Sequence, residues 1–373
     1  MTHRALDPNL KAEIQTAAQI LRAGGVVAFP TETVYGLGAD AANPAAVAKV
    51  FALKGRPATH PLIVHIADAA ALAHWCRAVP PAAEKLAAAF WPGPLTLILQ
   101  RAPGVIDAVT GGQDTVGLRV PAHPVARALL TAFGGGIAAP SANKFGRVSP
   151  TTAAHVKAEF AEGAGPEQIL DGGPCMVGVE STIVDLSGLP SRAPTLLRPG
   201  GVTKEQLEAV LGAPILVVGV PAPDAVTPGV DSLNTALPRV PGTLESHYAP
   251  LADVYPVTAA ELPMRIAALQ KEGIRFVVMA RRAEIQNAEA CQGGTNDRRG
   301  GGEGCGPGQA GIPCNTLYLA LPDDDAEYAR RLYQLLRDAD AQGFEAIVIV
   351  PPVAAGLGLA IVDRLRRAAG GSR

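Results

Sequence analysis

The stretch from Pro30 to Ile66 constrains the fold more than any other part of the chain. It reads PTETVYGLGADAANPAAVAKVFALKGRPATHPLIVHI, in which a hydroxyl-rich turn is followed by a helix and a strand. Asn43 is a favourable helix N-cap, and Pro44 occupies the first helical position, where its missing N–H costs nothing. Gly55 predicts the helix end. The stretch therefore predicts one capped helix between two segments of a sheet.

Lys54 and Arg56 flank the predicted helix end. If the chain turns at Gly55, both cations aim at one point, and convergent cations beside a backbone turn suit a polyphosphate. The alternative is that both side chains only solvate the C-terminus of the helix, where cations are common. We expect Lys54 to serve a solvent-open site, so that its replacement would spare the fold.

Polar residues leave the predicted strand that precedes this helix. The strand covers Val26–Phe29, and Thr31–Thr33 follows its end, where ligands usually lie in α/β sheets. The alternative is a plain polar turn in which Gly36 and Gly38 supply unusual backbone dihedrals.

Two further predicted strands each carry one polar side chain. Alternation over 61–66 places His65 on the face opposite most of the apolar residues, where a lone histidine is more often a satisfied core residue than a ligand. Alternation over 116–120 places Gly117 and Arg119 together on one face. A planar guanidinium beside a glycine suits a carboxylate, and the alternative is an exposed charge on a sheet face.

The block APSANKFGRVSP is the second dense group of polar residues. In an extended chain its Ser141 and Asn143 point the same way. Ser149 and Thr151 follow, and the alternative for them is to cap the next helix. That alternative is strong for Thr151 or Thr152, which stand just before a helical pattern.

A third block, VESTIVD, follows a glycine-rich turn. Ser181 and Thr182 enter the predicted strand of this block, and Arg198 comes just before the next turn. A lone cation in that place means little by itself. No Walker loop and no dinucleotide fingerprint is present, so a nucleotide site here would be of another kind.

These blocks resemble the YrdC-type threonylcarbamoyl-AMP synthases. PTETVYGLGADA, KGRP and PLIVHI occur in the order and spacing of that family across residues 10–205, while HYAP and GLGLAIVDRLRRAA resemble its longer, two-domain members. The resemblance implies an α/β fold: a twisted mixed-sheet YrdC-like domain plus a smaller Rossmann-like parallel α/β domain. The alternation of strand and helix patterns agrees with that class.

The resemblance also implies an activity. The family is a nucleotidyltransferase that makes L-threonylcarbamoyladenylate, pyrophosphate and water from L-threonine, bicarbonate and ATP, for the threonylcarbamoyladenosine of tRNA next to the anticodon. Mg²⁺ is expected with ATP, without assigned protein ligands. A downstream threonylcarbamoyl transferase complex is the expected partner, and a direct contact with tRNA is compatible with the sequence but not required.

Site residues follow from the resemblance position by position. The four residues expected to bind the nucleotide are Lys54, Arg56, Ser141 and Asn143. Lys54 and Arg56 are also the expected catalytic residues. The residues expected to hold L-threonine are Thr33, His65, Arg119 and Ser181. The residues expected to complete the ATP site are His60, Thr115, Ser149, Arg198, His247 and Tyr248. The sequence departs from the family just before His247, where Thr243–Ser246 lacks the basic residue often found in relatives.

The chain of 373 residues is long enough for two domains. We expect a YrdC-like catalytic domain over 1–212, a Pro-rich linker over 213–250 that closes over the active site, and a Rossmann-like domain over 251–373. A glycine-rich loop at about 287–313 is expected to be disordered. Beyond the segments above, the patterns predict strands at 95–99, 137–139, 182–186, 254–257, 274–279, 316–321 and 346–350, and helices at 9–22, 82–90, 259–271, 325–340 and 357–369.

Composition limits the other classes of function. No apolar run is long enough for a membrane span, and the first helix is amphipathic and not a signal segment, so we expect a cytoplasmic protein with no membrane partner. The net charge of −2 and the scarcity of aromatic residues disfavour a non-enzymatic RNA-binding or ribosome-maturation factor. A carbamoyl-phosphate-dependent carbamoyl-adenylate enzyme is a further alternative, but its usual additional metal-motif domains are not visible.

The cysteines form no recognisable metal motif. No Cys-x-x-Cys pair occurs among Cys76, Cys175, Cys291, Cys305 and Cys314. We therefore expect reduced thiols and no metal bound by the protein itself.

Overall fold

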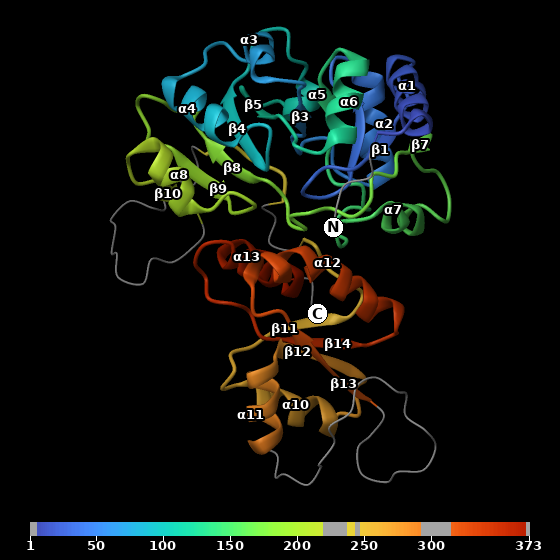
Figure 1. Cartoon of the computed structure of the whole chain (residues 1–373), viewed down its shortest axis with the longest axis vertical. Helices are drawn as coiled ribbons and strands as arrows, with labels where there is room; N and C mark the ends of the chain where they lie inside the picture. The colour runs from blue at the N-terminus through green and yellow to red at the C-terminus, as the bar shows by residue number, and fades with distance from the viewer. Residues whose placement is uncertain (1–5, 219–236, 243–246, 292–314, 371–373) are drawn as a thin grey trace. The chain divides into compact units, whose positions relative to one another are not determined.

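The structure is a computed structural model that describes residues 6–218, 237–242, 247–291 and 315–370. The chain divides into two compact units, residues 1–244 and 245–373 (Figure 1). Each unit has a sheet of its own and an apolar core of its own. The division falls inside the range 213–250 that the sequence predicts to be a linker.

The first unit is built on a large mixed sheet, which confirms the expected α/β class. Its strands are β1 (Val27–Phe29), β2 (Gly36–Asp40), β3 (Ile63–His65), β4 (Leu95–Gln100), β5 (Thr115–Arg119), β6 (Ile137–Ala138), β7 (Gln168–Ile169), β8 (Thr182–Asp185), β9 (Thr195–Arg198) and β10 (Leu216–Val217). They lie in the order β10-β9-β8-β4-β5-β3-β6-β2-β1-β7. β3 and β5 are parallel, whereas β4 and β5 are antiparallel.

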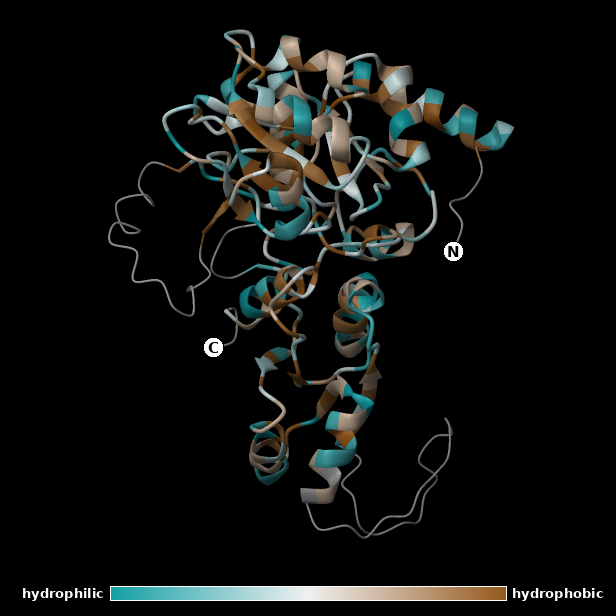
Figure 2. Ribbon diagram, turned by 60° about the vertical axis from the view of Figure 1, so that its left-hand side comes forward, coloured by the Kyte–Doolittle hydropathy of each residue, from teal (hydrophilic) through white to brown (hydrophobic). Residues whose placement is uncertain are grey.

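Helices cover the faces of this sheet (Figure 1). They are α1 (Pro8–Arg22), α2 (Pro44–Lys54), the 3₁₀ turn η1 (Ala69–Ala71), α3 (Leu72–Trp75), α4 (Pro81–Phe90), α5 (Asp107–Thr110), α6 (Pro124–Phe133), α7 (Ala153–Glu159) and α8 (Lys204–Leu211). α1 is amphipathic as predicted: it buries an apolar stripe that includes Leu10 and Ile14, and its outer side is hydrophilic, as Figure 2 shows. The hydroxyl of Thr152 caps α7 by accepting the N–H of His155 at 3.2 Å, as the sequence predicts.

The helix after the first polar turn has the predicted boundaries. The side chain of Asn43 accepts the N–H groups of Ala45 and Ala46, and Gly55 ends α2 with a left-handed φ of 64°. This fixes the turn that separates Lys54 from Arg56, because glycine adopts that conformation without steric cost.

The alternative of a plain polar turn with unusual dihedrals at Gly36 and Gly38 is wrong. Both glycines lie in β2, which pairs with β1, and neither has a positive φ. A Cβ at Gly38 would lie 2.7 Å from the ring of Phe29 and 2.7 Å from a methyl group of Ile137. Close packing of the sheet, and not an unusual dihedral, therefore requires glycine at that position.

The apolar core of the first unit lies on both faces of the sheet. The larger cluster includes Leu62, Val64 and Ile66 of the predicted alternating strand, which confirms their shared face. On the opposite face Val240 packs against a row of strand residues, namely Ile63, Ile98, Ile183 and Leu197. The segment 237–242 of the predicted linker thus lies across the sheet face that also carries Gly117.

The predicted linker contains regular structure at its start. Leu216 and Val217 form β10, which pairs in parallel with β9, so regular structure extends into the first residues of the predicted linker. The residues 219–236 and 243–246 lie outside the described part of the chain. None of the described helices is long and apolar enough to cross a membrane.

The second unit has the small parallel sheet that the sequence predicts. Its strands are β11 (Asp253–Pro256), β12 (Phe276–Arg281), β13 (Thr316–Leu321) and β14 (Ala346–Ile349), in the order β11-β14-β12-β13, with every pair parallel. Its helices are α10 (Leu262–Lys271), α11 (Arg282–Cys291), α12 (Asp325–Ala341) and α13 (Gly358–Ala369). The helix α11 includes residues 287–291, so the prediction that the disordered loop begins at about 287 is wrong for these residues. The rest of that loop, 292–313, lies outside the described residues.

Candidate active site

Polar side chains gather where several neighbouring strands of the large sheet end. His65 and Arg119 are opposite each other in the parallel pair β3 and β5, each at the carboxyl end of its strand. The antiparallel neighbour β4 brings Thr96 to this edge, where Ser181 directly precedes β8 and Arg198 ends β9. The sheet therefore brings together three of the four residues predicted to hold L-threonine and one predicted to hold ATP.

Thr33 is the fourth residue predicted to bind L-threonine, and it lies in a tight, fully buried turn after β1. Its hydroxyl lies 2.8 Å from that of Thr31, which itself donates to the carbonyl oxygen of Val34 at 2.6 Å. These contacts fix the position of the Thr33 hydroxyl before any ligand arrives.

His65 and Arg119 are both buried. The alternatives from the sequence, a satisfied core histidine and an exposed charge, therefore do not describe these two residues. The Nδ1 atom of His65 has no hydrogen-bond partner among the described residues, unlike a satisfied core histidine. Burial and the neighbouring charge of Arg119 lower the pKa of His65 to about 3, so the ring is neutral near pH 7. Arg119 is only 4% exposed and is not a surface charge.

Arg198 connects Ser181, which is predicted to bind L-threonine, to the linker segment 237–242. Its Nε and Nη2 donate to the carbonyl oxygen of Ser181 at 3.1 and 2.9 Å, and Nη2 donates to the Ser181 hydroxyl at 3.0 Å. Nη1 donates to the carbonyl oxygen of Pro241 at 2.9 Å. The hydroxyl of Ser181 is also 2.8 Å from that of Thr96. Arg198 is therefore a structural connection as well as a candidate phosphate contact.

Lys54 does not serve a solvent-open site, contrary to the sequence-based expectation. It is 3% exposed, and its Nζ donates to the carbonyl oxygen of Ser141 at 2.6 Å and to that of Asn143. Burial, with the charge of Arg56 as a second cause, lowers the pKa of Lys54 well below its usual value. The same contacts place the predicted Lys-x-Arg and Ser-x-Asn blocks side by side, although they are far apart in sequence.

The remaining tetrad residues surround this lysine. Arg56 is 7% exposed and donates to the carbonyl oxygen of Pro61 at 3.0 Å. Asn143 is buried and donates through Nδ2 to two backbone carbonyls, while its Oδ1 has no partner among the described residues. A buried acceptor without a donor is costly unless a ligand supplies one, so Oδ1 is a candidate contact for a nucleotide.

His60, Thr115 and Ser149 lie on three different segments of the first unit. The ring of His60 stands edge-on to that of Phe145, with the centroids 5.7 Å apart, and partial burial followed by the charge of Arg56 lowers the His60 pKa. Thr115 begins β5. The buried hydroxyl of Ser149 donates to Oε1 of Glu180 at 2.6 Å, so it does not cap the next helix.

His247 and Tyr248 belong to the second unit. The N–H of His247 donates to the carbonyl oxygen of Arg367 at 3.1 Å. Tyr248 has a positive φ of 62°, stacks on Tyr333 with the centroids 5.7 Å apart, and carries the guanidinium of Arg364 over its ring. These residues are firmly packed where they are, and their contact with ATP stays a prediction.

Sequence reasoning missed three side chains that hold the predicted site residues. They are Thr96 beside Ser181, Glu180 beside Ser149, and Glu32 beside Arg119. Glu32 stands inside the first polar turn, and an acid at the end of a buried strand calls for a cation nearby. That signal would have marked Glu32, whereas the partner itself is visible only in the fold.

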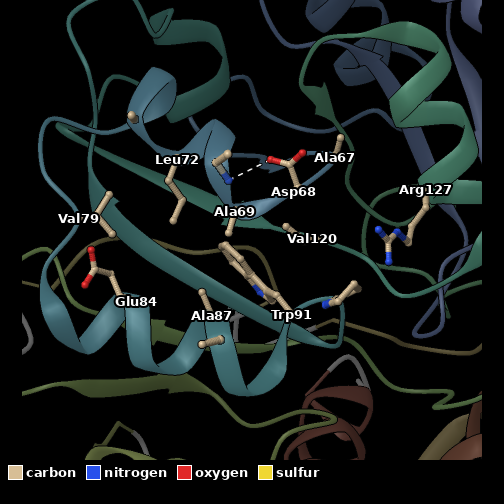
Figure 3. Close-up of a pocket in the computed structure, with 14 residues that line it drawn as sticks. Ala67, Asp68, Ala69, Leu72, Val79, Glu84, Ala87, Trp91, Val120 and Arg127 are labelled. Atoms are coloured by element: carbon tan, nitrogen blue, oxygen red, sulfur yellow. Dashed lines mark hydrogen bonds between the residues drawn. The ribbon is translucent and has the colours of Figure 1, made fainter.

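A separate cavity of about 500 Å³ lies beside α3 and α4 (Figure 3). Trp91, Leu72 and several alanines line it, with Asp68 and Arg127 at its sides. The side chain of Asp68 caps η1 by accepting a hydrogen bond from the N–H of Ala70, which is drawn as the dashed line in Figure 3. None of the predicted site residues lines this cavity.

Two family models match the chain. One is described as telomere recombination and matches residues 19–200. The other is described as threonylcarbamoyl-AMP synthase, C-terminal domain, and matches residues 202–370.

Relatives and a solved structure match over almost the whole length. Threonylcarbamoyl-AMP synthases of Pyrococcus abyssi and Bacillus subtilis are 40% and 41% identical, each covering 96% of this chain and 94% and 93% of the relative. The crystal structure of P. abyssi Sua5 complexed with L-threonine has a TM-score of 0.78 and 38% identity, covering 96% of this chain and 95% of that one. The chain belongs to the two-domain threonylcarbamoyl-AMP synthase family.

Proposed function

We infer that the protein is a threonylcarbamoyl-AMP synthase, an ATP-dependent nucleotidyltransferase that acts in tRNA modification. The observation that carries this conclusion is the match to curated synthases over 96% of the chain, together with the P. abyssi relative solved with L-threonine. The convergence of His65, Arg119 and Ser181 at one edge of the sheet supports it independently, since these residue types suit an amino acid.

We propose that this edge holds L-threonine. A guanidinium binds a carboxylate through paired N–H groups, which assigns the α-carboxylate to Arg119. The neutral ring of His65 and the hydroxyls of Thr33 and Ser181 are then available to position the amine and the side-chain hydroxyl. The orphaned Nδ1 atom of His65 supports this assignment, because a ligand would supply its missing partner.

We propose that ATP lies against the segment around α2 and the Ser-x-Asn block. Arg56 supplies positive charge, the Nζ of Lys54 supplies a hydrogen-bond donor, and Asn143 offers an unpartnered acceptor. The residues proposed to complete this site are His60, Thr115, Ser141, Ser149, Arg198, His247 and Tyr248. Their chemistry suits phosphates, ribose hydroxyls and a base, and their roles follow from the family pattern.

The proposed reaction has two steps. The threonine amine attacks bicarbonate, forming a C–N bond and a carbamate with loss of water. A carbamate oxygen then attacks the α-phosphorus of ATP, and the bond to the β-phosphate breaks to release pyrophosphate. Negative charge grows on phosphoryl oxygens in the second step, where Lys54 and Arg56 would stabilise it. Holding three substrates in one buried site supplies much of the remaining rate enhancement.

Mg²⁺ would enter as part of Mg-ATP. Among the described residues, no three His, Cys, Asp or Glu side chains lie together as ligands of an ion would. Two carboxylates beside site residues, Glu32 and Glu180, already accept hydrogen bonds from Arg119 and Ser149. We propose that phosphate oxygens and water hold the ion.

The proposed cellular context follows from the product. A mixed anhydride of a carbamate and AMP hydrolyses readily in water, so a threonylcarbamoyl transferase complex must consume it promptly. We place the enzyme in the cytoplasm, where ATP and tRNA are available.

Isotope labelling tests this proposal. Purified protein is incubated with ATP, L-threonine and ¹³C-bicarbonate, and the adenylate is analysed by mass spectrometry. We expect threonylcarbamoyl-AMP that carries one ¹³C atom. An unlabelled adenylate, or one formed only with carbamoyl phosphate, would contradict the proposed substrates.

A further inference from the structure

A buried ion pair joins the first polar turn to the end of β5. Oε1 of Glu32 lies 2.7 Å from Nη2 of Arg119, and the two side chains are 7% and 4% exposed. The residues are 87 positions apart in sequence. Little water reaches either charge, so each depends on the other for compensation.

Glu32 is held in place from several directions. Its Oε2 accepts the N–H of Ala122 at 3.0 Å, just beyond the end of β5. Its carbonyl oxygen accepts the N–H of Val177 at 2.8 Å. The carboxylate therefore has a fixed orientation, and it bridges Arg119 to the backbone of the following turn.

These contacts use only part of the Arg119 guanidinium. Nε donates to the carbonyl oxygen of Gly93 at 3.3 Å, and Nη2 donates to Glu32. No hydrogen bond from Nη1 is found within the described ranges. A guanidinium can bind several acceptors at once through its five N–H groups. Its free edge is thus left for a carboxylate, in an orientation set by Glu32 and Gly93.

We propose that Glu32 is a positioning residue for the amino-acid substrate: it orients Arg119 so that the remaining N–H edge meets the α-carboxylate. This rests on the proposed threonine site. An arginine side chain has many rotamers, and ordering it at the moment of binding would weaken affinity. Glu32 orders it in the free enzyme. Because Thr33 is the next residue, the same turn sets two of the proposed threonine contacts.

A purely structural role for Glu32 predicts a different outcome. Loss of any buried carboxylate beside an arginine destabilises the fold, because the cation is left uncompensated. The pair of Asp185 and Arg192 provides a matched control, with Asp185 in strand β8 of the same sheet. The Asp185 side chain is fully buried and its partner is 20% exposed, and neither is a predicted site residue.

Three variants test the proposal: Glu32→Gln, Glu32→Asp and the control Asp185→Asn. Binding of L-threonine is measured by calorimetry, and KM values come from pyrophosphate release at temperatures where each variant is folded. Glutamine matches glutamate in shape but has one acceptor oxygen where glutamate has two, so it loses the charge and cannot accept from both Arg119 and the N–H of Ala122. Aspartate keeps the charge with a shorter reach.

We expect Glu32→Gln to weaken threonine binding and raise its KM by about tenfold to a hundredfold, with KM for ATP changed less than about twofold. Glu32→Asp should recover part of the affinity. Asp185→Asn should lower the melting temperature with threonine affinity unchanged. If Glu32→Gln binds threonine as tightly as the wild type, or if KM rises equally for threonine and ATP, this inference is overturned and the proposed threonine site still stands. A wild-type chain that binds no threonine would overturn the proposed site as well.

Discussion

His65 and Arg119 face each other across β3 and β5, one at the end of each parallel strand. The charge of Arg119 adds to burial in lowering the pKa of His65 to about 3. A ring that is neutral throughout the physiological range is a poor proton carrier but a good hydrogen-bonding group. His65 therefore orients threonine in our account and does not act as the general base.

Acid stability should depend on His65. Between pH 6.5 and 3 the unfolded chain binds a proton at this residue that the folded chain does not bind. Its contribution therefore lowers stability as the pH falls through that window, by at most about 1.4 kcal/mol per pH unit. We expect His65→Gln to show a shallower loss of unfolding free energy between pH 6.5 and 4.5 in urea titrations. An unchanged slope in His65→Gln would refute the assignment.

Replacing Lys54 should cost both activity and stability. In Lys54→Ala the carbonyl oxygens of Ser141 and Asn143 lose their hydrogen-bond donor in a buried setting, which costs about 1–3 kcal/mol of unfolding free energy. Pyrophosphate release should be abolished even where the variant is folded. Lys49 is the control on the same helix, since its Nζ donates to the carbonyl oxygen of Gly24 at 2.7 Å away from the site. Lys49→Ala should retain full activity, and an active Lys54→Ala enzyme would rule out the proposed phosphate role.

Gly200 should tolerate no side chain. A Cβ there would lie 2.3 Å from the carbonyl oxygen of Glu180 and 2.4 Å from the nitrogen of Thr182, so the backbone that carries Ser181 must move. We expect Gly200→Ala to lose about 1–3 kcal/mol of stability and most of its threonine affinity. Gly104 has open space around it, and Gly104→Ala is the control for the loss of glycine itself. Normal threonine affinity in Gly200→Ala would mean that the turn does not position Ser181.

The linker segment should loosen when Gln113 is removed. The Gln113 side chain accepts the N–H of Arg239 at 2.7 Å and donates to its carbonyl oxygen at 3.1 Å. We expect Gln113→Ala to speed tryptic cleavage after Arg239 and to raise KM for ATP. Gln100 bonds instead to Ser187, so Gln100→Ala should cleave at the wild-type rate. Equal cleavage rates in both variants would show that this pair does not hold the segment.

The sequence predicted correctly those elements that are determined by residues close together in the chain. The boundaries of α2 follow from Asn43 and Gly55, each of which acts on its own few neighbours. The shared face of Gly117 and Arg119 follows from alternation along one strand. β2 was missed because glycines usually mark turns, and only the position of Phe29 against Gly38 shows why they are needed in a strand.

The parts of the site that could not be predicted depend on contacts between distant segments. Glu32 and Arg119 are 87 residues apart, and so are Lys54 and Ser141. No periodicity relates such positions, and burial of Lys54 is decided by the Ser-x-Asn block that covers it.

The measurement that tests the central claim most directly is pyrophosphate release from ATP by the purified protein, with L-threonine and bicarbonate added singly and together. We predict release that requires both. Release with neither substrate, or no release with all three, would contradict the assignment of this chain as a threonylcarbamoyl-AMP synthase.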